Sequence, residues 1–219
     1  MYDKIIHSKR RTLGLEITSH GEVILRVPQK VKEKEVRIFL GRNKNWIQKH
    51  KSEAIQRARE IPKKLFVHGE YLPYLGRSFP LCISDQKRPK IMFQGYFSLS
   101  STYQKAGREV FVAWAKKEAR KVCKERVQVY AERAGREYAS VRITSARRRW
   151  GSCSGDSLNF TWRLILAPLW VLDYIVAHEV AHLVHKNHGK RFWNKVEKIY
   201  PNYKKAEKWL KNHGHLLNV

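Results

Sequence analysis

Apolar positions recur at two different periods in the first part of the chain. Between residues 11 and 27 they recur at every second position on both sides of the polar segment SHGE, which predicts a β-hairpin with one buried face. From Lys32 to about Arg59 they lie three or four residues apart, as on an amphipathic helix, and Pro62 closes this helix. Short β-prone runs interrupted by glycine and proline fill residues 65–100 and predict a small antiparallel sheet.

The pattern after residue 103 favours helices around one pair of strands. Helical spacing of apolar residues from about Lys105 to Arg136 predicts a long helix. Two β-prone runs, residues 141–147 and 158–164, predict strands joined by a turn rich in glycine and serine. The next predicted helix is APLWVLDYIVAHEVAHLVH, with Pro168 near its first turn, where a missing N–H costs nothing. KRFWNKVEKIY and YKKAEKWLKNHG predict two short C-terminal helices.

Together these elements predict an α+β fold in two regions. Residues 1–103 form a β-rich N-terminal region with one helix. Residues 104–219 form a second domain with the long helix, the small sheet and the C-terminal helices. The chain has 219 residues, of which 42% are hydrophobic, so it is long enough to bury a sizeable core.

The composition adds a strong positive charge. Lysine and arginine number 45 against 19 acidic residues, and the resulting formal net charge of +26 is spread along the whole chain. Such a charge attracts polyanions, which makes nucleic acid a candidate partner. It describes a well-solvated surface equally well, and the sequence carries no signature of a module that reads RNA or DNA.

Cysteine usage and hydropathy favour the cytoplasm. Cys82, Cys123 and Cys153 are odd in number, far apart and never form a CxxC pair, which argues against a disulfide framework and against a zinc site made of cysteines alone. The N-terminal segment lacks the apolar run typical of a signal peptide, and no stretch of about 18 apolar residues could span a membrane. We therefore expect a cytoplasmic protein with no membrane partner.

Four histidines gather in the segment IVAHEVAHLVHKNHGKRFW, residues 175–193. Residues four apart on an α-helix lie about 40° apart around the axis and about 6 Å apart along it, so His178 and His182 can bind one cation. Glu179 lies about 100° round from His178. It is near enough to reach a water on the metal as a general base, the role of glutamate in an HExxH motif. The alternative is a set of buried histidines satisfied by protein neighbours.

Three residues are candidates for the third ligand. His185 is nearly on the same face as His178 but about 10 Å further along the axis, too far for one tetrahedral ion unless the helix ends or bends. Asn187 and Gly189 suit a left-handed helix end, and a chain that turns there folds His188 back over the first two histidines. We favour His188, with Glu197 on the next helix as the alternative carboxylate ligand.

Several segments resemble the YgjP-like metallopeptidase family. They are RRRWGSCS, LNFTWRLILAP, LDYIVAHEVAHLVHKNHGKRFW and KKAEKWLKNHG, together with the N-terminal SKRRTLGLEITSHGEVILRVP and FLGRNKNWIQKH. This family is a zincin group similar to the SprT-like and WLM-domain proteases. The resemblance covers nearly the whole chain, and its HExxH core is far more specific in this combination than alone.

The resemblance implies a zincin-type catalytic domain with zinc bound by His178, His182 and His188 and with Glu179 as the base. It also implies that a strand at a sheet edge holds an extended substrate above the metal. Our candidate is the strand around residues 159–164, since added β-pairing would fix a peptide without reading its sequence.

We therefore expect a zinc-dependent metallohydrolase, a peptidase that acts on a peptide or protein substrate. The rival interpretations are a basic nucleic-acid-associated protein with a zincin fold and a non-peptidase or structural zinc protein. Other residues have candidate roles by residue type alone. The candidate donors of a hydrogen bond to a developing oxyanion are Arg149, Asn159, Tyr200 and His213. Asp173 is either a hydrogen-bond acceptor for a metal-binding histidine or an exposed charge near the start of the helix. Cys153 is either a fourth metal ligand or a small buried side chain that packs in the core.

Overall fold

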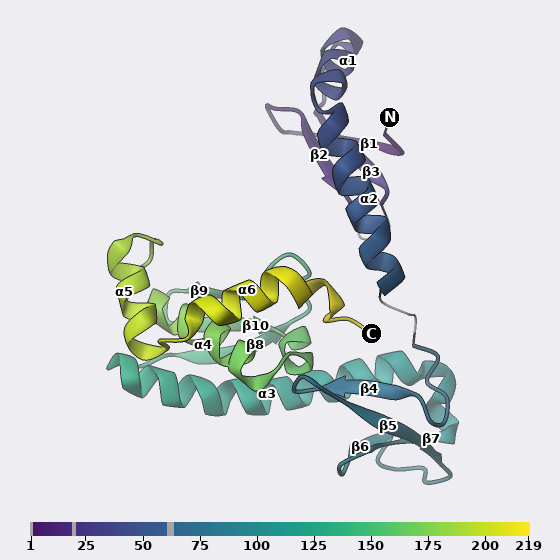
Figure 1. Cartoon of the computed structure of the whole chain (residues 1–219), viewed down its shortest axis with the longest axis vertical. Coiled ribbons are helices and arrows are strands. Elements are labelled where there is room, and N and C mark those ends of the chain that lie inside the picture. The colour runs from purple at the N-terminus through teal and green to yellow at the C-terminus, as the bar shows by residue number, and fades with distance from the viewer. Residues whose placement is uncertain (1, 19–20, 61–63) are drawn as a thin grey trace. The chain divides into compact units, whose positions relative to one another are not determined.

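The computed structural model describes residues 2–18, 21–60 and 64–219. The chain divides into two compact units, Met1–Pro62 and Lys63–Val219 (Figure 1). Each unit has its own cluster of buried apolar side chains. None of the described helices combines the length and the hydropathy needed to cross a membrane.

The first unit joins a small sheet to two helices. Strands β1 (Lys4–Ser8), β2 (Gly14–Ile17) and β3 (Val23–Pro28) form a sheet in the order β1-β3-β2. The predicted hairpin is confirmed by the antiparallel pairing of β2 with β3, whereas the parallel pairing of β1 with β3 was not predicted. Every second residue of β3 is buried, which gives the sheet its apolar face.

The predicted single helix of the first unit is broken into α1 (Glu33–Arg42) and α2 (Lys44–Glu60). At the break, Asn43 has φ −102° and ψ 9°, and its side-chain amide donates to the carbonyl of Phe39 at 2.8 Å. This local hydrogen bond competes with the helical pattern, as asparagine side chains often do. Val36 and Leu40 of α1 and Ile47 of α2 pack in one core with the buried residues of β3.

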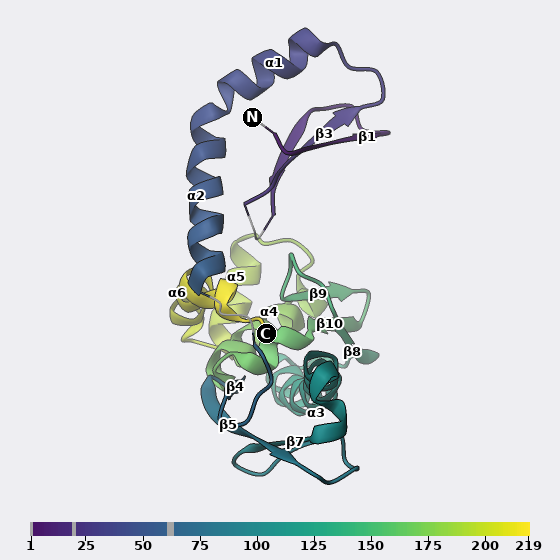
Figure 2. The same ribbon diagram turned by 90° about the vertical axis from the view of Figure 1, so that its right-hand side faces the viewer.

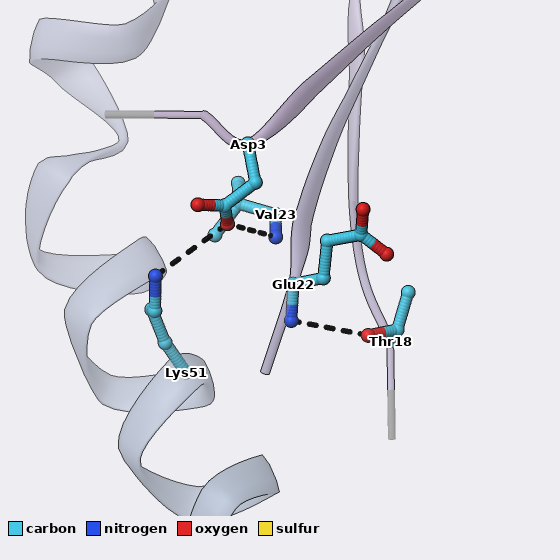
Figure 3. Close-up of polar contacts among 5 residues, drawn as sticks. All are labelled: Asp3, Thr18, Glu22, Val23 and Lys51. Atoms are coloured by element: carbon cyan, nitrogen blue, oxygen red, sulfur yellow. Dashed lines mark hydrogen bonds and ion pairs between the residues drawn. The ribbon is translucent and has the colours of Figure 1, made fainter. Parts of the chain in front are cut away.

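Asp3 connects three segments of the first unit (Figure 3). Its carboxylate accepts a hydrogen bond from the backbone N–H of Val23 at 2.7 Å and lies 3.5 Å from Nζ of Lys51 on α2. At the hairpin, the N–H of Glu22 donates to Oγ1 of Thr18 at 3.0 Å. The Val23 hydrogen bond is the main cause of the lowered pKa of Asp3.

The second unit begins with a four-stranded sheet of strands β4 (Tyr71–Tyr74), β5 (Arg77–Ser84), β6 (Ile91–Phe93) and β7 (Phe97–Ser100). Their order is β4-β5-β7-β6. The outer pairs are antiparallel, but β5 and β7 run parallel. The predicted sheet therefore exists, and the prediction that it is wholly antiparallel is wrong, because β7 pairs with β5 rather than with β4.

The remaining elements of the second unit follow the predicted order, with one exception. They are η1 (Ser101–Ala106), α3 (Gly107–Ala134), β8 (Ser140–Thr144), β9 (Gly151–Ser154), β10 (Ser157–Thr161), η2 (Trp162–Leu166), α4 (Leu169–Val184), α5 (Lys190–Ile199), α6 (Tyr203–His213) and η3 (Gly214–Leu216). The α+β class predicted from the sequence is thus the observed one. The exception is strand β9, which lies in the segment that was predicted to be a turn. The second predicted strand ends at Thr161, and a 3₁₀ helix follows it.

The domain boundary predicted near residue 103 falls inside the second unit. The ring of Phe97 on β7 lies 5.5 Å from that of Phe111 and 4.8 Å from that of Trp114, both on α3. A methyl group on Gly107 would lie 2.6 Å from Cβ of Phe66, so the chain before β4 also packs closely on α3. The sheet of β4 to β7 therefore shares the core of the helices that follow it.

Helix α4 is the most deeply buried helix of the second unit, as its continuous apolar sequence predicts. It packs against α3, α5, α6 and strand β9 (Figure 2). Strand β9 belongs to a three-stranded sheet in the order β8-β10-β9. This arrangement places one edge of the sheet beside the helix that carries the HExxH motif.

Candidate metal centre

Three imidazoles converge at the end of α4. Nε2 of His188 lies 3.1 Å from Nε2 of His178 and 3.1 Å from Nε2 of His182. Zinc bonds to histidine at about 2.0–2.1 Å in tetrahedral geometry, which separates two ligand nitrogens by about 3.3 Å. The three side chains therefore fit a zinc ion placed between them.

The chain reaches this arrangement because α4 stops at Val184. His185 is extended, with φ −129° and ψ 110°, and the chain turns back to bring His188 over the helix end. The predicted return of His188 is observed, but its predicted cause is wrong. Neither Asn187 nor Gly189 has a positive φ, so no left-handed residue makes the turn.

The other two candidate ligands lie outside the cluster. His185 contributes its backbone carbonyl, which lies 3.0 Å from Nδ1 of His182, and its imidazole is not among the converging groups. Glu197 is exposed on α5. Across the described histidine, cysteine and acidic residues, the set able to hold one metal ion is His178, His182 and His188.

The protonation of the imidazoles suits metal binding. Nδ1–H of His182 can donate to the carbonyl of His185, which leaves the lone pair of Nε2 directed into the cluster. Burial, with the neighbouring His182 and His188, lowers the pKa of His178 to about 4. Burial also lowers the pKa of His182. Both rings are therefore neutral near pH 7, the form that binds metal.

Phe192 supports all three imidazoles from the following helix. Its ring is fully buried and its centroid lies 4.9, 4.4 and 4.7 Å from those of His178, His182 and His188. Trp193 is half-buried, with its ring 5.8 Å from that of His178. Phe192 is thus a core residue that also contacts every proposed ligand, a contact that the sequence did not reveal.

Glu179 is buried beside the cluster, with 6% of its surface exposed. Burial raises the pKa of its carboxyl to about 8, and the charge of Arg149 acts in the opposite direction. A cation held by the adjacent imidazoles would also favour the carboxylate.

Gly151 makes room for this carboxyl. A methyl group on its Cα would lie 2.5 Å from Oε1 and 2.6 Å from Cγ of Glu179. Sequence reasoning missed this residue, although a glycine at the start of a strand is a known sign of close approach.

The strand beside Glu179 is β9, which corrects the predicted substrate strand. Residues 162–164 of the predicted segment lie in η2, and residues 159–161 lie on β10, which is central because it pairs with β8 and with β9. Its backbone groups are therefore already used within the sheet. In the part of the chain that the structure describes, β9 pairs only with β10, so the edge nearest Glu179 belongs to residues 151–154.

Two of the four candidate oxyanion donors are used elsewhere. The amide of Asn159 donates to the carbonyl of Ser152 at 3.3 Å, across β10 and β9. The hydroxyl of Tyr200 donates to the carbonyl of Trp170 at 2.7 Å. Both groups thus hold the fold together.

The other two candidate donors are His213, which packs on a neighbouring ring, and Arg149, whose charge acts on Glu179. His213 stacks on Trp209 with ring centroids 4.9 Å apart, and its Nδ1 lies 3.1 Å from the carbonyl of Trp209. Arg149 is exposed, and its charge acts on Glu179. Arg149 is therefore the one of the four with an electrostatic link to the proposed base.

Asp173 and Cys153 lie outside the group formed by His178, His182 and His188. Asp173 is buried and forms a bidentate ion pair with Arg126 of α3, at 2.5 and 2.9 Å. It is therefore neither an acceptor behind a metal ligand nor an exposed charge at the helix start, the two roles expected from the sequence. Cys153 is half-buried on β9, where its thiol donates to the carbonyl of Gly155 at 3.3 Å.

Comparison with known proteins gives the same assignment as the motifs. The family model described as the YgjP-like metallopeptidase domain matches residues 11–213. Among solved structures, the metallopeptidase zymogen abylysin of Pyrococcus abyssi is similar with a TM-score of 0.39 and 21% identity, over 44% of this chain and 96% of that one. No curated protein matches the sequence. Because the family model spans nearly all of the chain, this protein belongs to the YgjP-like metallopeptidase family.

Proposed function

We propose that this metallopeptidase is a zinc enzyme in which His178, His182 and His188 hold the ion and Glu179 is the general base. The observation that carries the proposal is the convergence of three Nε2 atoms beside the buried carboxyl of Glu179, which lies on the same helix as His178 and His182. Three nitrogen ligands with one open coordination position are typical of catalytic zinc rather than structural zinc.

The chain's own groups suit peptide hydrolysis. Zinc bound by the three imidazoles supplies a Lewis acid at its open position. Glu179 takes one proton from the attacking water as the new C–O bond forms, and returns it to the amine nitrogen as the C–N bond breaks. Phe192 holds the imidazoles in position, which preserves this geometry through the reaction.

Strand β9 is our proposed place for the substrate backbone. Its free edge offers N–H and C=O groups to an extended peptide, so binding needs no particular side chains at most positions. Gly151 lies at the start of this edge and against Glu179, which puts a paired peptide near the base.

Three variants and two assays, of zinc content and of peptide cleavage, test this proposal. Glu179→Gln should keep stoichiometric zinc and lose peptide cleavage, because the amide cannot accept the proton from water. Full cleavage by this variant would eliminate Glu179 as the base.

The ligand assignment is tested by metal content. His188→Ala should lose zinc, whereas Glu197→Ala, which removes an exposed carboxylate, should retain it. The reverse result would show that Glu197 is the third ligand.

The formal charge of +26 supports a second candidate function, association with nucleic acid. Phosphate contacts would make the affinity for an oligonucleotide fall steeply as salt rises. A protein that fails to bind an oligonucleotide at low ionic strength would dispose of this candidate.

A further inference from the structure

The loop that leads into β9 carries three consecutive exposed arginines, Arg147, Arg148 and Arg149. Among the residues that the structure describes, neither Arg147 nor Arg149 forms an ion pair with a carboxylate. Like charges held close together repel one another, and an anion that binds between them relieves the repulsion.

Arg163 holds this loop in place through hydrogen bonds to its backbone. Its Nη2 donates to the carbonyls of Ala146 at 3.0 Å and Arg147 at 2.9 Å, and its guanidinium lies 4.9 Å from the ring centroid of Trp150. These contacts place the guanidinium of Arg163 beside the arginine loop, and burial, followed by the charge of Arg147, lowers the pKa of Arg163. The arginine loop is therefore held in place before any ligand binds.

The loop also continues the strand that faces the proposed base. Arg149 is followed by Trp150, whose carbonyl accepts a hydrogen bond from the N–H of Thr161 at 2.9 Å, and then by Gly151, which lies against Glu179. An extended chain spans at most about 3.6 Å per residue, so Arg149 lies within about 7 Å and Arg147 within about 14 Å of Gly151. A peptide that pairs with β9 beside Glu179 and extends past Gly151 therefore runs toward the segment that carries these arginines.

The opposite end of β9 has a mixed charge. Nζ of Lys186 donates to the carbonyl of Gly155 at 3.0 Å, in the turn after the strand. Asp156 lies in the same turn, and both charges act on Cys153 of β9. The excess of positive charge is therefore concentrated at the arginine end.

We propose that the substrates are peptide segments with acidic side chains, whose carboxylates bind Arg147 and Arg149 while the backbone pairs with β9. This inference rests on the proposed peptidase function. Guanidinium groups bind carboxylates through two parallel hydrogen bonds, which gives orientation as well as attraction. The acidic residues lie two to four positions from the scissile bond, on the side of the peptide that meets the loop.

The test compares matched peptides on the zinc-loaded full chain. One peptide carries glutamates at these positions and the other carries glutamines, so that only charge differs. The wild type should cleave the acidic peptide with a kcat/KM higher on the order of tenfold, mainly through KM, as expected for two exposed ion pairs. The ratio should shrink as salt rises, because the charges are exposed. Equal cleavage of the two peptides would overturn the inference.

Charge reversal separates the arginine loop from the general charge of the protein. Arg147→Glu/Arg149→Glu should invert the preference and favour a matched peptide with lysines. The control Arg120→Glu/Lys124→Glu reverses two exposed charges on α3 and should keep the preference for the acidic peptide. An acidic preference that survives in the loop variant, or is lost equally in the control, contradicts the proposal.

A binding measurement distinguishes failure of this inference from failure of the proposed function. If the zinc-loaded wild type cleaves neither the acidic, the neutral nor the basic peptide, the peptidase function with these substrates fails. The affinities of the acidic and neutral peptides for Glu179→Gln then decide the inference by themselves. The inference is supported if the acidic peptide binds more tightly and this advantage is lost when Arg147→Glu/Arg149→Glu is added. Equal affinities overturn it. If an oligonucleotide at low salt binds the arginine loop and the acidic peptide binds there no better than the neutral one, nucleic acid is the ligand of the loop. This result would also overturn the inference.

Discussion

The backbone of Gly151 lies so close to the side chain of Glu179 that a methyl group on its Cα would meet Oε1 at 2.5 Å. The two residues come from different elements, β9 and α4, which pack against each other. The glycine is needed here for space rather than for backbone conformation, since its φ is not positive. Because Gly151 has no side chain, the carboxyl of Glu179 can lie directly against the backbone of β9.

Gly151→Ala should therefore displace Glu179 and reduce kcat/KM for peptide cleavage. A misplacement of about 1 Å costs on the order of 10²-fold in rate. Zinc content should remain unchanged, because Gly151 is not among the converging groups. The control is Gly41→Ala in the first unit, where no heavy atom lies within 4 Å of the added methyl group. Full activity of Gly151→Ala would show that the position of Glu179 does not matter.

Phe192 connects the stability of the second unit to its metal affinity. Phe192→Ala removes a fully buried ring and should lower the free energy of unfolding by roughly 3–5 kcal/mol. It should also weaken zinc binding, measured by competition with a chelator, because the ring contacts all three imidazoles.

Phe111→Ala is the matched control for this experiment. Phe111 is also fully buried in the same core, but it packs against Phe97 and Trp114. Its loss should cost a similar free energy of unfolding in urea and leave zinc affinity unchanged. Equal loss of zinc affinity in both variants would mean that Phe192 acts only through overall stability.

The parts of the site that the sequence predicted are those set by local chain geometry. His178 and His182 lie one helical turn apart, so their spacing alone places them together. The return of His188 was predicted from Asn187 and Gly189 as a left-handed helix end, and it occurs although neither residue has a positive φ. The family resemblance rests on the same segments and is confirmed by the match over residues 11–213.

The parts that the sequence missed depend on contacts between distant segments. Asp173 pairs with Arg126, which lies 47 residues away on another helix, and no local pattern marks that partner. Strand β10 was predicted to be an edge, but it is central because it pairs in parallel with β8 as well as with the neighbouring β9. The close approach of Gly151 to Glu179 follows from that strand order. Strand order is a property of the whole fold, and hydrophobic period reveals only which face of a strand is buried.

The ion pair of Asp173 and Arg126 supports α4 from the side of α3. Arg126→Met should destabilise the second unit by roughly 2–4 kcal/mol, because it leaves a buried carboxylate without its partner. The double variant Arg126→Met/Asp173→Leu should be more stable than Arg126→Met alone, since it removes the unpaired charge as well. Urea unfolding of the wild type, both single variants and the double variant measures the coupling. Additive losses would show that the pair contributes nothing beyond its separate side chains.

Cys123 on α3 should make the second unit less stable at high pH. Burial, followed by the charge of Asp173, raises the pKa of its thiol from 9.0 to about 12. Below about pH 9 the thiol is protonated in both states, so it adds no pH dependence. Between about 9 and 12 the unfolded chain loses this proton and the folded chain keeps it, so the free energy of unfolding falls by up to about 1.4 kcal/mol per pH unit. Cys123→Ala loses packing at every pH but should lack this slope; a wild-type curve parallel to that of the variant across this window would contradict the assignment.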